Sequence, residues 1–345
     1  MISTRKSKCS ILTTIIFLIS VSIGISYSSN IIYNIEENLK SSKISGRIQI
    51  YGNSEWEDLK SAGLCTGSGT SSNPYVIKDL EINAGGICIR IQDTDVYFKI
   101  QNCTLSDASA TYDAAIYFQN VQNGIIIDNE IFNNKIGIFL DPNSIQNHIQ
   151  GNFIHDNDVW AIQLYQTSDV VISYNEVYNN QDGILLDDKS SHNVIESNKI
   201  YENNNGIHLY GSSHNIIRNN TVYSCITGME IDYSDFNKIY DNTLSSSESG
   251  IRLDHSDDTQ ISNNILSHFN YAISISVNNR NQITQNTIDY CECGIYIGER
   301  CTCNTISSNV FSNNGMDIYG SQEMCLELFL PILIGIVLTI SHIDL

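Results

Sequence analysis

The sequence predicts an all-β solenoid, a right-handed single-stranded parallel β-helix of about ten or eleven coils, with an apolar helix at each terminus. Three regularities predict this fold: a recurring asparagine, apolar residues at fixed distances on both sides of it, and a small residue that opens an alternating strand. The asparagines follow one another at steps of 22 or 23 residues, at Asn129, Asn152, Asn175, Asn198, Asn220, Asn242, Asn264, Asn286 and Asn309.

Apolar residues flank each of these asparagines in the same way. One stands three residues before the asparagine and another two residues after it, as Ile195 and Ile200 do around Asn198. Eight residues after the asparagine most coils have Gly or Ala, followed by a period-two alternation such as that from Gly206 to Tyr210. Because one coil cannot bury its apolar face alone, stacked coils in parallel register must bury a shared core.

We expect the recurring asparagines to stack as an amide ladder on one edge of the coils. We also expect them to adopt the positive φ that sharp corners require, because Asn tolerates this conformation better than most residues. A second set of asparagines precedes the ladder by five residues. Its members are Asn147, Asn193, Asn215, Asn237, Asn281 and Asn304.

The composition agrees with an exported β-solenoid. An apolar content of 41% over 345 residues is enough for a sizeable core, and only three prolines accompany frequent Asn, Ser and Ile. The formal net charge of −20 excludes nucleic acid as an expected partner, because phosphate backbones bind basic surfaces. An acidic exterior suits cations, cationic partners or simple solubility.

Both ends of the chain carry apolar segments. Residues 1–28 combine basic residues with an apolar run from Ile11 to Ile25, which predicts a signal peptide or an uncleaved signal anchor. Residues 325–343 contain a second apolar run, which predicts a membrane anchor; a cap folded over the last coil is the alternative. We therefore expect the body to be extracytoplasmic, at the cell surface or anchored to a membrane.

The region before the repeats is expected to close the solenoid. Residues 29–75 are predicted to form an N-terminal cap, and residues 76–320 the β-helix repeats. A capping-box pattern that begins at Ser54 predicts a short helix ending near Ala62. Such a helix can cover the otherwise open first coil, with Trp56 packed on it.

The cysteines favour disulfides. Eight of the ten belong to the exported body, where an oxidising compartment favours disulfides over metal ligands or reactive thiols. The alternative is a four-thiolate zinc site formed by Cys291, Cys293, Cys301 and Cys303, but their one-residue spacing differs from that of zinc knuckles. The sequence leaves the pairing of the cysteines open.

One face of the coils carries the side chains expected of a functional site. Outward strand positions repeat in register, so the middle coils place carboxylates, imidazoles, a cation and an aromatic ring on one face, where they can bind a sugar or a divalent cation such as calcium. The candidates are Asp187, Asp188, His208, Tyr210, Glu230, Asp232, Arg252, Asp254 and His255. We expect no cofactor and no dedicated metal site. The competing interpretation is a solvated strand surface whose charges balance one another.

A second outward column is aromatic. It stands three residues after each ladder position and reads Phe132, His155, Tyr178, Tyr201 and Tyr223. Tyr178, Tyr201 and Tyr223 can offer ring faces to a sugar. The same stacking also stabilises neighbouring strands, and we favour this interpretation.

The coils resemble those of right-handed parallel β-helix repeat proteins of the NosD and CASH type, which are related to pectate-lyase-like folds. The resemblance covers roughly residues 67–320, and the stretches GTSSNPYVIKDLEI and CIRIQDTDVYFKIQNCTL resemble the first coils of archaeal exported members. It implies the fold and export far more specifically than an activity, because this architecture hosts lyases, hydrolases, epimerases, adhesins and tailspikes.

The motifs of the common enzymes with this fold are missing from the sequence. There is no Arg-x-Pro-x-x-Arg as in pectate lyases and no Gly-His-Gly as in polygalacturonases, and the four methionines and scattered histidines form no evident copper-binding cluster. We therefore expect a non-catalytic surface protein that binds carbohydrate, such as a surface glycan, or another surface partner. The alternatives are a polysaccharide lyase or glycoside hydrolase that uses the acidic face, and a purely structural surface rod.

Overall fold

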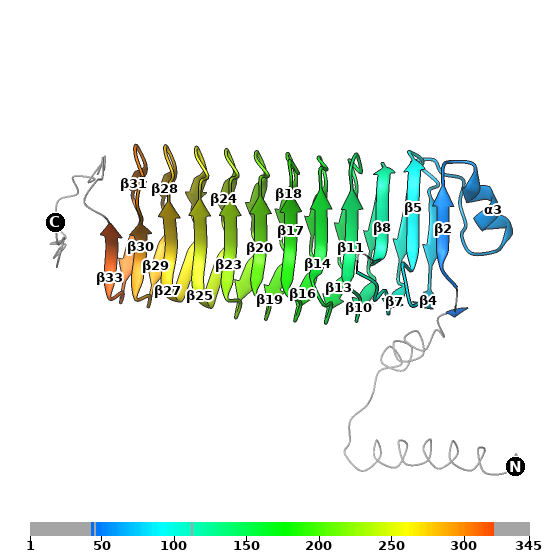
Figure 1. Ribbon diagram of the computed structural model, residues 1–345, viewed down its shortest axis with the longest axis horizontal. Coiled ribbons are helices and arrows are strands. Elements are labelled where there is room, and N and C mark those ends of the chain that lie inside the picture. The colour runs from blue at the N-terminus through cyan, green and yellow to red at the C-terminus, as the bar shows by residue number, and fades with distance from the viewer. Residues whose placement is uncertain (1–42, 45, 112, 321–345) are drawn as a thin grey trace, which may run out of the picture. The chain divides into compact units, whose positions relative to one another are not determined.

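The computed structural model describes residues 43–44, 46–111 and 113–320, which form a parallel β-solenoid of about eleven coils (Figure 1). Successive coils pair in parallel, with one strand per coil in an 11-stranded sheet and further strands in a 22-stranded sheet. The predicted right-handed β-helix is confirmed. The solenoid has three strand-bearing faces, here called the long-strand, short-strand and third face.

The bounds of the elements follow the repeat. The long-strand face contains β2 (Ile48–Tyr51), β5 (Ile89–Thr94), β8 (Ala114–Val121), β11 (Ile136–Asp141), β14 (Trp160–Tyr165), β17 (Asp182–Asp187), β20 (Asn205–Tyr210), β23 (Thr227–Asp232), β30 (Cys293–Ile297) and β33 (Met316–Gly320). The short-strand face contains β1 (Lys43–Ile44), β4 (Leu80–Asn83), β7 (Thr104–Ser106), β10 (Glu130–Phe132), β13 (Phe153–His155), β16 (Glu176–Tyr178), β19 (Lys199–Tyr201), β22 (Thr221–Tyr223), β29 (Thr287–Asp289) and β32 (Val310–Ser312). Two long strands, β25 (Thr243–Asp254) and β27 (Ile265–Ser276), span both of these faces.

The third face is the 11-stranded sheet. Its strands are β3 (Tyr75–Lys78), β6 (Phe98–Gln101), β9 (Gly124–Ile127), β12 (His148–Gln150), β15 (Val171–Ser173), β18 (Val194–Glu196), β21 (Ile216–Arg218), β24 (Lys238–Tyr240), β26 (Gln260–Ser262), β28 (Gln282–Thr284) and β31 (Thr305–Ser307). One helix, α3 (Glu55–Ser61), lies at the N-terminal end of the described coils.

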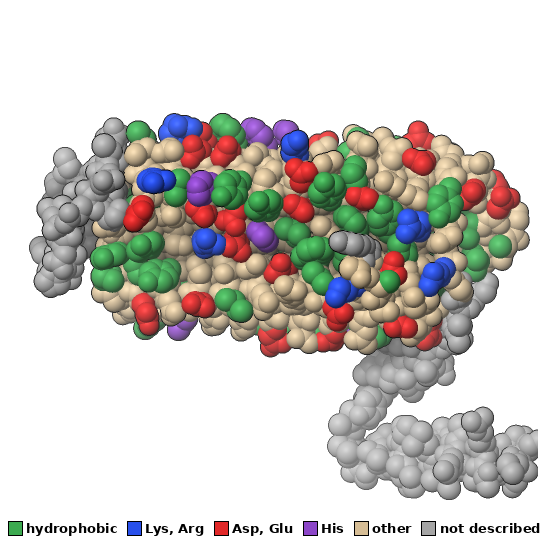
Figure 2. Space-filling view, in the orientation of Figure 1, with side chains coloured by type: hydrophobic (Ala, Val, Ile, Leu, Met, Phe, Trp, Pro, Cys, Tyr) green, Lys and Arg blue, Asp and Glu red, His purple; other side chains and the backbone are tan. Residues whose placement is uncertain are grey.

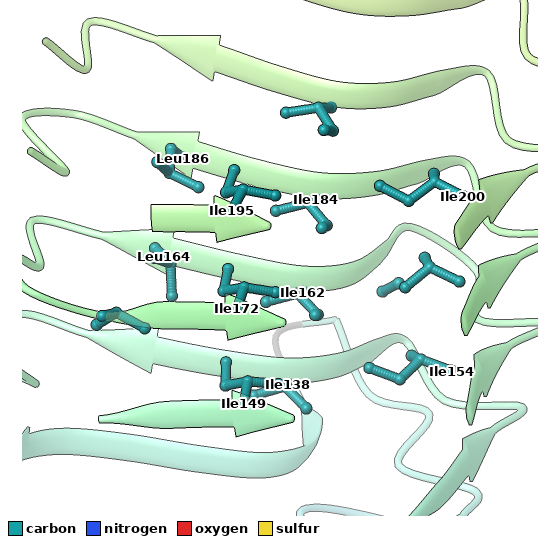
Figure 3. Close-up of a cluster of buried hydrophobic side chains, with 14 of the residues drawn as sticks. Ile138, Ile149, Ile154, Ile162, Leu164, Ile172, Ile184, Leu186, Ile195 and Ile200 are labelled. Carbon is teal, nitrogen blue, oxygen red and sulfur yellow. The ribbon is translucent and has the colours of Figure 1, made fainter. Parts of the chain in front are cut away.

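The core consists of aliphatic columns that run along the solenoid (Figure 3). The apolar residues that flank each ladder asparagine are buried, as Ile195 and Ile200 are, and they stack on their equivalents in neighbouring coils. The long-strand face contributes a further column, in which Ile184 pairs in register with Ile162 and Ile207. The predicted inward orientation is therefore confirmed.

The predicted asparagine ladder is present and buried. Each amide Nδ2 donates to Oδ1 of the next ladder asparagine, with donor to acceptor distances of 2.9–3.0 Å from Asn129 to Asn309. The same oxygens accept from the main-chain N–H of the preceding ladder residue, as Asn220 Oδ1 does from Asn198 N at 2.9 Å. The second set also bonds between coils, for example from Asn193 N to Asn215 Oδ1 at 2.8 Å.

The expected positive φ of the ladder asparagines is wrong. The left-handed conformation falls one residue earlier, at Tyr174 (φ 56°), Ser197 (φ 57°) and Asp241 (φ 56°), for example. The chain turns at that residue, and the ladder asparagine then directs its amide inward to the main chain of the adjacent coils. Two further ladders were not predicted from the sequence: Asn134, Asn157, Asn180 and Asn203, and Ser190, Ser212, Ser234 and Ser256.

The predicted helix covers the first coil, although its capping differs from the expectation. Trp56 is fully buried, stacks on Tyr75 at a centroid distance of 5.0 Å, and donates through Nε1 to Thr94 Oγ1 at 3.1 Å. The Ser54 side chain makes no capping hydrogen bond, because Ser54 itself has helical φ and ψ. Glu55 Oε2 instead accepts from Tyr51 N at 2.7 Å, which ties the helix to β2.

The expected disulfides are not formed among the described cysteines, all eight of which are free thiols. Four of them, Cys103, Cys225, Cys291 and Cys301, replace Asn or Ser at corner positions of the coils. Cys103 N donates to Asn129 Oδ1, Cys225 N donates to Ser247 Oγ, and Cys301 Sγ bonds Ile275 O in the place of Ser256. Cys291 precedes β30 and Cys301 follows it, and among the described residues these four thiols form no group close enough to share an ion, so the four-thiolate zinc alternative is not assembled either.

Some expectations concern residues outside the described part of the chain. The leader at 1–28 and the apolar segment at 325–343 both lie there. Among the described residues, none of the helices has the length and hydrophobicity needed to cross a membrane. Within the segment predicted to be the cap, β1 and β2 already pair in parallel with β4 and β5.

Candidate functional site

The predicted columns of the long-strand face are in register. His208 pairs with Glu230, Glu230 with Arg252, and Tyr210 with Asp232 across adjacent strands. Their side chains point outward because Ile207 and Leu209 occupy the alternate, buried positions. Figure 2 shows acidic, basic and histidine side chains close together on this face, beside a group of hydrophobic side chains towards its C-terminal end.

Three of the predicted residues form a tight group. One ligand atom each of His208, Glu230 and Asp232 lies within 4.8 Å of the others, and all three side chains are half-buried. His208 Nε2 lies 3.8 Å from Asp232 Oδ2. Burial opposes the charged imidazole, but the carboxylates of Asp232, Glu230 and Asp182 outweigh it and raise the pKa of His208.

Arg252 is the cation at the edge of this group. It forms an ion pair with Glu230, and its Nη2 lies 3.6 Å from Asp254 Oδ2. Asp254 Oδ1 in turn lies 2.9 Å from His255 Nδ1. Arg252 therefore pairs with Glu230 and Asp254 as expected, but one cation faces two carboxylates, and Asp182, Asp187 and Asp232 are further acidic residues on the same face.

The remaining predicted residues lie around this group. Asp187 is half-buried, and its pKa is raised by that burial. Asp188 turns away, because its Oδ2 accepts from Gln166 Nε2 at 2.6 Å, which lowers the pKa of Asp188. Tyr210 is about half exposed and meets the ring of Tyr233 edge-on.

The structure adds a hollow that sequence reasoning missed. It has a volume of about 470 Å³ and lies over β23, β25, β27 and β30. Its lining includes Arg252, Glu248, Tyr271, Ser274 and Tyr296. Glu248 and Tyr271 precede the regularly alternating ends of β25 and β27, so the period-two pattern of the sequence did not place them on this face.

The rings of the predicted aromatic column stack on one another. Phe132, His155, Tyr178, Tyr201 and Tyr223 have successive centroid distances of 4.8–5.4 Å and interplanar angles of 4–7°. The inner rings therefore use both faces on their neighbours and present only edges to solvent. This geometry favours strand stabilisation over sugar stacking, because a sugar needs a free ring face.

The fold, its buried ladders and its inward aliphatic columns define the class: the chain is a right-handed parallel β-helix repeat protein. Residues 61–222 match the family model described as a right handed beta helix region. Residues 161–324 match the model described as periplasmic copper-binding protein (NosD). Each match covers just under half of the chain. A comparison of the sequence with curated proteins finds no match.

Solved structures with the same fold are distant in sequence. The A-module of mannuronan C-5 epimerase AlgE6 from Azotobacter vinelandii superposes with a TM-score of 0.62 at 11% identity, over 84% of this chain and 90% of that chain. DFA-IIIase from Arthrobacter chlorophenolicus A6 in complex with GF2 gives 0.53 at 12%, over 80% and 92%. The Agl-KA catalytic domain gives 0.54 at 13%, over 75% of this chain and 59% of that one.

The copper in the name of one matching family can be compared with the residues of this chain. Within the described coils, His208, Glu230 and Asp232 are the group of three His, Cys or acidic side chains close enough to share an ion. Imidazole and carboxylate ligands suit divalent copper or zinc, whereas monovalent copper prefers the sulfur of Met or Cys. The group therefore fits a divalent transition-metal ion.

Proposed function

We propose that this chain is an extracytoplasmic β-helix protein that binds carbohydrate on its long-strand face, in the hollow beside Arg252. The observation that carries the proposal is the lining of that hollow, where the rings of Tyr271 and Tyr296 meet at 5.4 Å beside hydroxyl, carboxylate and guanidinium groups. A binding site needs this combination, because aromatic rings accept the apolar face of a sugar while polar groups bond its hydroxyls.

The rings at the hollow differ from those of the aromatic column in a way that favours this location. Tyr271 is 45% exposed and meets Tyr296 edge to face, with an interplanar angle of 65°, so one ring does not cover the other. Tyr178 and Tyr201, in contrast, are stacked face to face. Tyr296 also stacks on Tyr319 at a centroid distance of 5.9 Å, so the exposed ring of Tyr271 is the one that can offer its face to a sugar.

The comparisons support the proposal in general terms. The mannuronan C-5 epimerase with the same fold acts on a sugar polymer by its name, and one matching family is described as periplasmic, which agrees with a location outside the cytoplasm. Attachment to a membrane or to the cell surface through residues 1–28 and 325–343 is part of the proposal.

A second candidate function is glycoside cleavage. One oxygen of Glu230 and one of Asp232 lie within 4.8 Å of each other, close to the separation of about 5–5.5 Å between the two carboxyl groups of retaining glycosidases. Arg252 forms an ion pair with Glu230, which is the candidate nucleophile. We favour binding without cleavage, because the motifs of the common lyases and hydrolases of this fold are missing.

The experiment that tests the function begins with the full chain on a glycan array, followed by titration calorimetry with each glycan that binds. Y271A and Y296A are expected to abolish binding, whereas Y174A, which removes an exposed ring at a distant corner, is expected to leave it unchanged. Absence of any bound glycan, or equal binding by Y271A and Y296A, contradicts the proposed site.

The same glycans then distinguish the two functions. Incubation with the full chain, followed by assays for new reducing ends and unsaturated uronates, is expected to show no release. Release that disappears in E230Q or D232N would establish glycoside cleavage instead of simple binding.

A further inference from the structure

The group of His208, Glu230 and Asp232 is assembled from two adjacent strands. His208 projects from β20, and Glu230 and Asp232 project from the same side of β23, two residues apart. Parallel register sets His208 directly beside Glu230, and Asp232 Oδ2 lies 3.8 Å from His208 Nε2. The backbone of two paired strands therefore positions all three side chains without any contribution from a loop.

Two atoms of this group are buried without a hydrogen-bond partner. They are Nε2 of His208 and Oδ1 of Asp232. The nearest charged oxygen to Nε2, Asp232 Oδ2, lies at 3.8 Å, which is too long for a hydrogen bond. Buried polar atoms are nearly always paired, so these two indicate a partner that the protein itself does not supply.

We propose that His208, Glu230 and Asp232 bind a divalent transition-metal ion such as Zn²⁺. A neutral imidazole nitrogen with two carboxylate oxygens is a borderline ligand set that suits Zn²⁺ or Cu²⁺, whereas Ca²⁺ and Mg²⁺ prefer oxygen ligands throughout. The two carboxylates balance the charge of the ion. Three protein ligands leave a fourth zinc position for water or a ligand group.

The geometry requires only a small closure. Zinc bond lengths of about 2.0–2.2 Å place two ligands of a tetrahedral site roughly 3.4 Å apart. The ligand atoms here lie within 4.8 Å of one another, so side-chain rotations that bring them together by at most about 1.4 Å complete the site.

Arg252 makes the proposal sharper. Its guanidinium forms an ion pair with Glu230 and therefore competes with a metal ion for that carboxylate. Binding of the ion releases Arg252 towards Asp254, whose Oδ2 already lies 3.6 Å from Arg252 Nη2. Removal of the guanidinium is then expected to strengthen metal binding. If the acidic surface only attracted cations without a defined site, loss of Arg252 would change metal affinity far less.

This inference does not depend on carbohydrate binding, and its test contains no glycan. The full chain is stripped of metal with EDTA and titrated with ZnCl2 by calorimetry, and with CoCl2 by visible absorption, whose intensity reports the coordination geometry. Wild type is expected to bind one Zn²⁺ at this site. H208Q, E230Q and D232N are each expected to weaken binding by at least about tenfold, a loss seen even when only outer-shell partners are mutated.

Matched controls and a gain-of-affinity variant complete the experiment. H214Q removes another imidazole, which stacks between His192 and Phe236 at a different corner, and E196Q removes another paired carboxylate; both are expected to bind Zn²⁺ as wild type does. R252Q is expected to bind it more tightly. Cu²⁺ is expected to compete with Zn²⁺ for the same three residues and Ca²⁺ is not.

Three results would overturn the proposal. They are the absence of Zn²⁺ binding by the stripped wild type, affinities of H208Q, E230Q and D232N equal to that of wild type, and displacement of Zn²⁺ by equimolar Ca²⁺. Melting temperatures measured in EDTA show that each variant folds. Since H208Q, E230Q and D232N change outward side chains, any one that folds is enough to decide.

Discussion

The side-chain amide of Asn198 donates to Oδ1 of Asn220 at 3.0 Å, while its own Oδ1 accepts from both nitrogens of Asn175 in the preceding coil. Its Nδ2 also reaches Ile172 O at 2.9 Å. One buried side chain thus joins the main chains and side chains of neighbouring coils. The ladder is a continuous hydrogen-bonded column, and its strength can be measured at a single position.

N198A is expected to destabilise the fold by roughly 3 kcal/mol or more. The substitution leaves several buried polar groups without a hydrogen bond, and each such group costs about 1–3 kcal/mol of stability. Urea denaturation of wild type and variant measures the difference. The matched control is N204A, which removes an exposed asparagine from the next turn and is expected to have little effect. Equal destabilisation by the two variants would argue against a structural ladder.

The inward aliphatic columns give a second prediction. Ile217 is fully buried, and truncation in I217A is expected to cost about 2–5 kcal/mol through lost burial and the cavity that remains. Lys238 is exposed and lies beside this column, paired with Ile216 on the adjacent strand. K238A is expected to change the unfolding free energy very little. Chemical denaturation of both variants checks the contrast, and a mild effect of I217A would be incompatible with a close-packed core.

The contribution of the acidic face to glycan binding can be measured separately from its contribution to stability. Replacement of Asp187, Glu230, Asp232 and Asp254 by their amides is expected to abolish binding of any glycan found on the array. The unfolding free energy is expected to stay within about 1 kcal/mol, because surface ion pairs contribute little and the loss of four acids eases self-repulsion. Calorimetry in EDTA checks binding without any contribution from a metal ion.

The control for that variant carries the same change in net charge elsewhere. Amide replacements of the exposed Glu81, Glu130, Asp158 and Glu202 are expected to leave glycan affinity unchanged. If both quadruple variants lose affinity equally, binding depends on the overall charge of the protein and the acidic face is not a specific site.

The raised pKa of His208 predicts a pH dependence of stability. A histidine whose pKa is higher in the folded than in the unfolded state stabilises the fold below the unfolded value of about 6.5, and this contribution disappears as the pH rises through the folded-state pKa. The unfolding free energy of wild type minus that of H208Q is therefore expected to be larger at about pH 5.5 than at about pH 9. Denaturation in EDTA at both values measures it, and a difference that grows with pH contradicts the assignment.

The thiols provide a chemical test of the corner positions. In the native chain Cys303 is exposed, whereas the other seven described cysteines are buried, and burial raises the pKa of Cys88 to about 12 and that of Cys103 to about 11. Brief treatment with iodoacetamide followed by peptide mass spectrometry is expected to label Cys303 among these eight. Labelling in urea serves as the control and should reach all of them. Disulfide-linked peptides between described cysteines would contradict the structure.

Much of this architecture could be predicted because it follows from the local periodicity of the sequence. The steps of 22 or 23 residues fixed the ladder from Asn129 to Asn309, and the flanking positions identified inward residues such as Ile195 and Ile200. The period-two alternation placed His208, Glu230 and Arg252 in one outward column. Stacked identical coils turn a sequence repeat directly into a spatial column, so register follows from alignment alone.

The tertiary structure decided what periodicity does not specify. At the ladder corner of this coil the residue with positive φ is Ser197 and not Asn198, because the amide of Asn198 must point inward to bond the neighbouring coil. Cys103 takes the place of an asparagine and remains a thiol, and its main-chain N–H donates to Asn129 Oδ1 at that corner. The closeness of His208 to Asp232 depends on rotamers and burial, which vary from coil to coil while the sequence repeat stays constant. Repetition determines where a side chain stands along the solenoid, but only the packing around it determines which atoms it can reach.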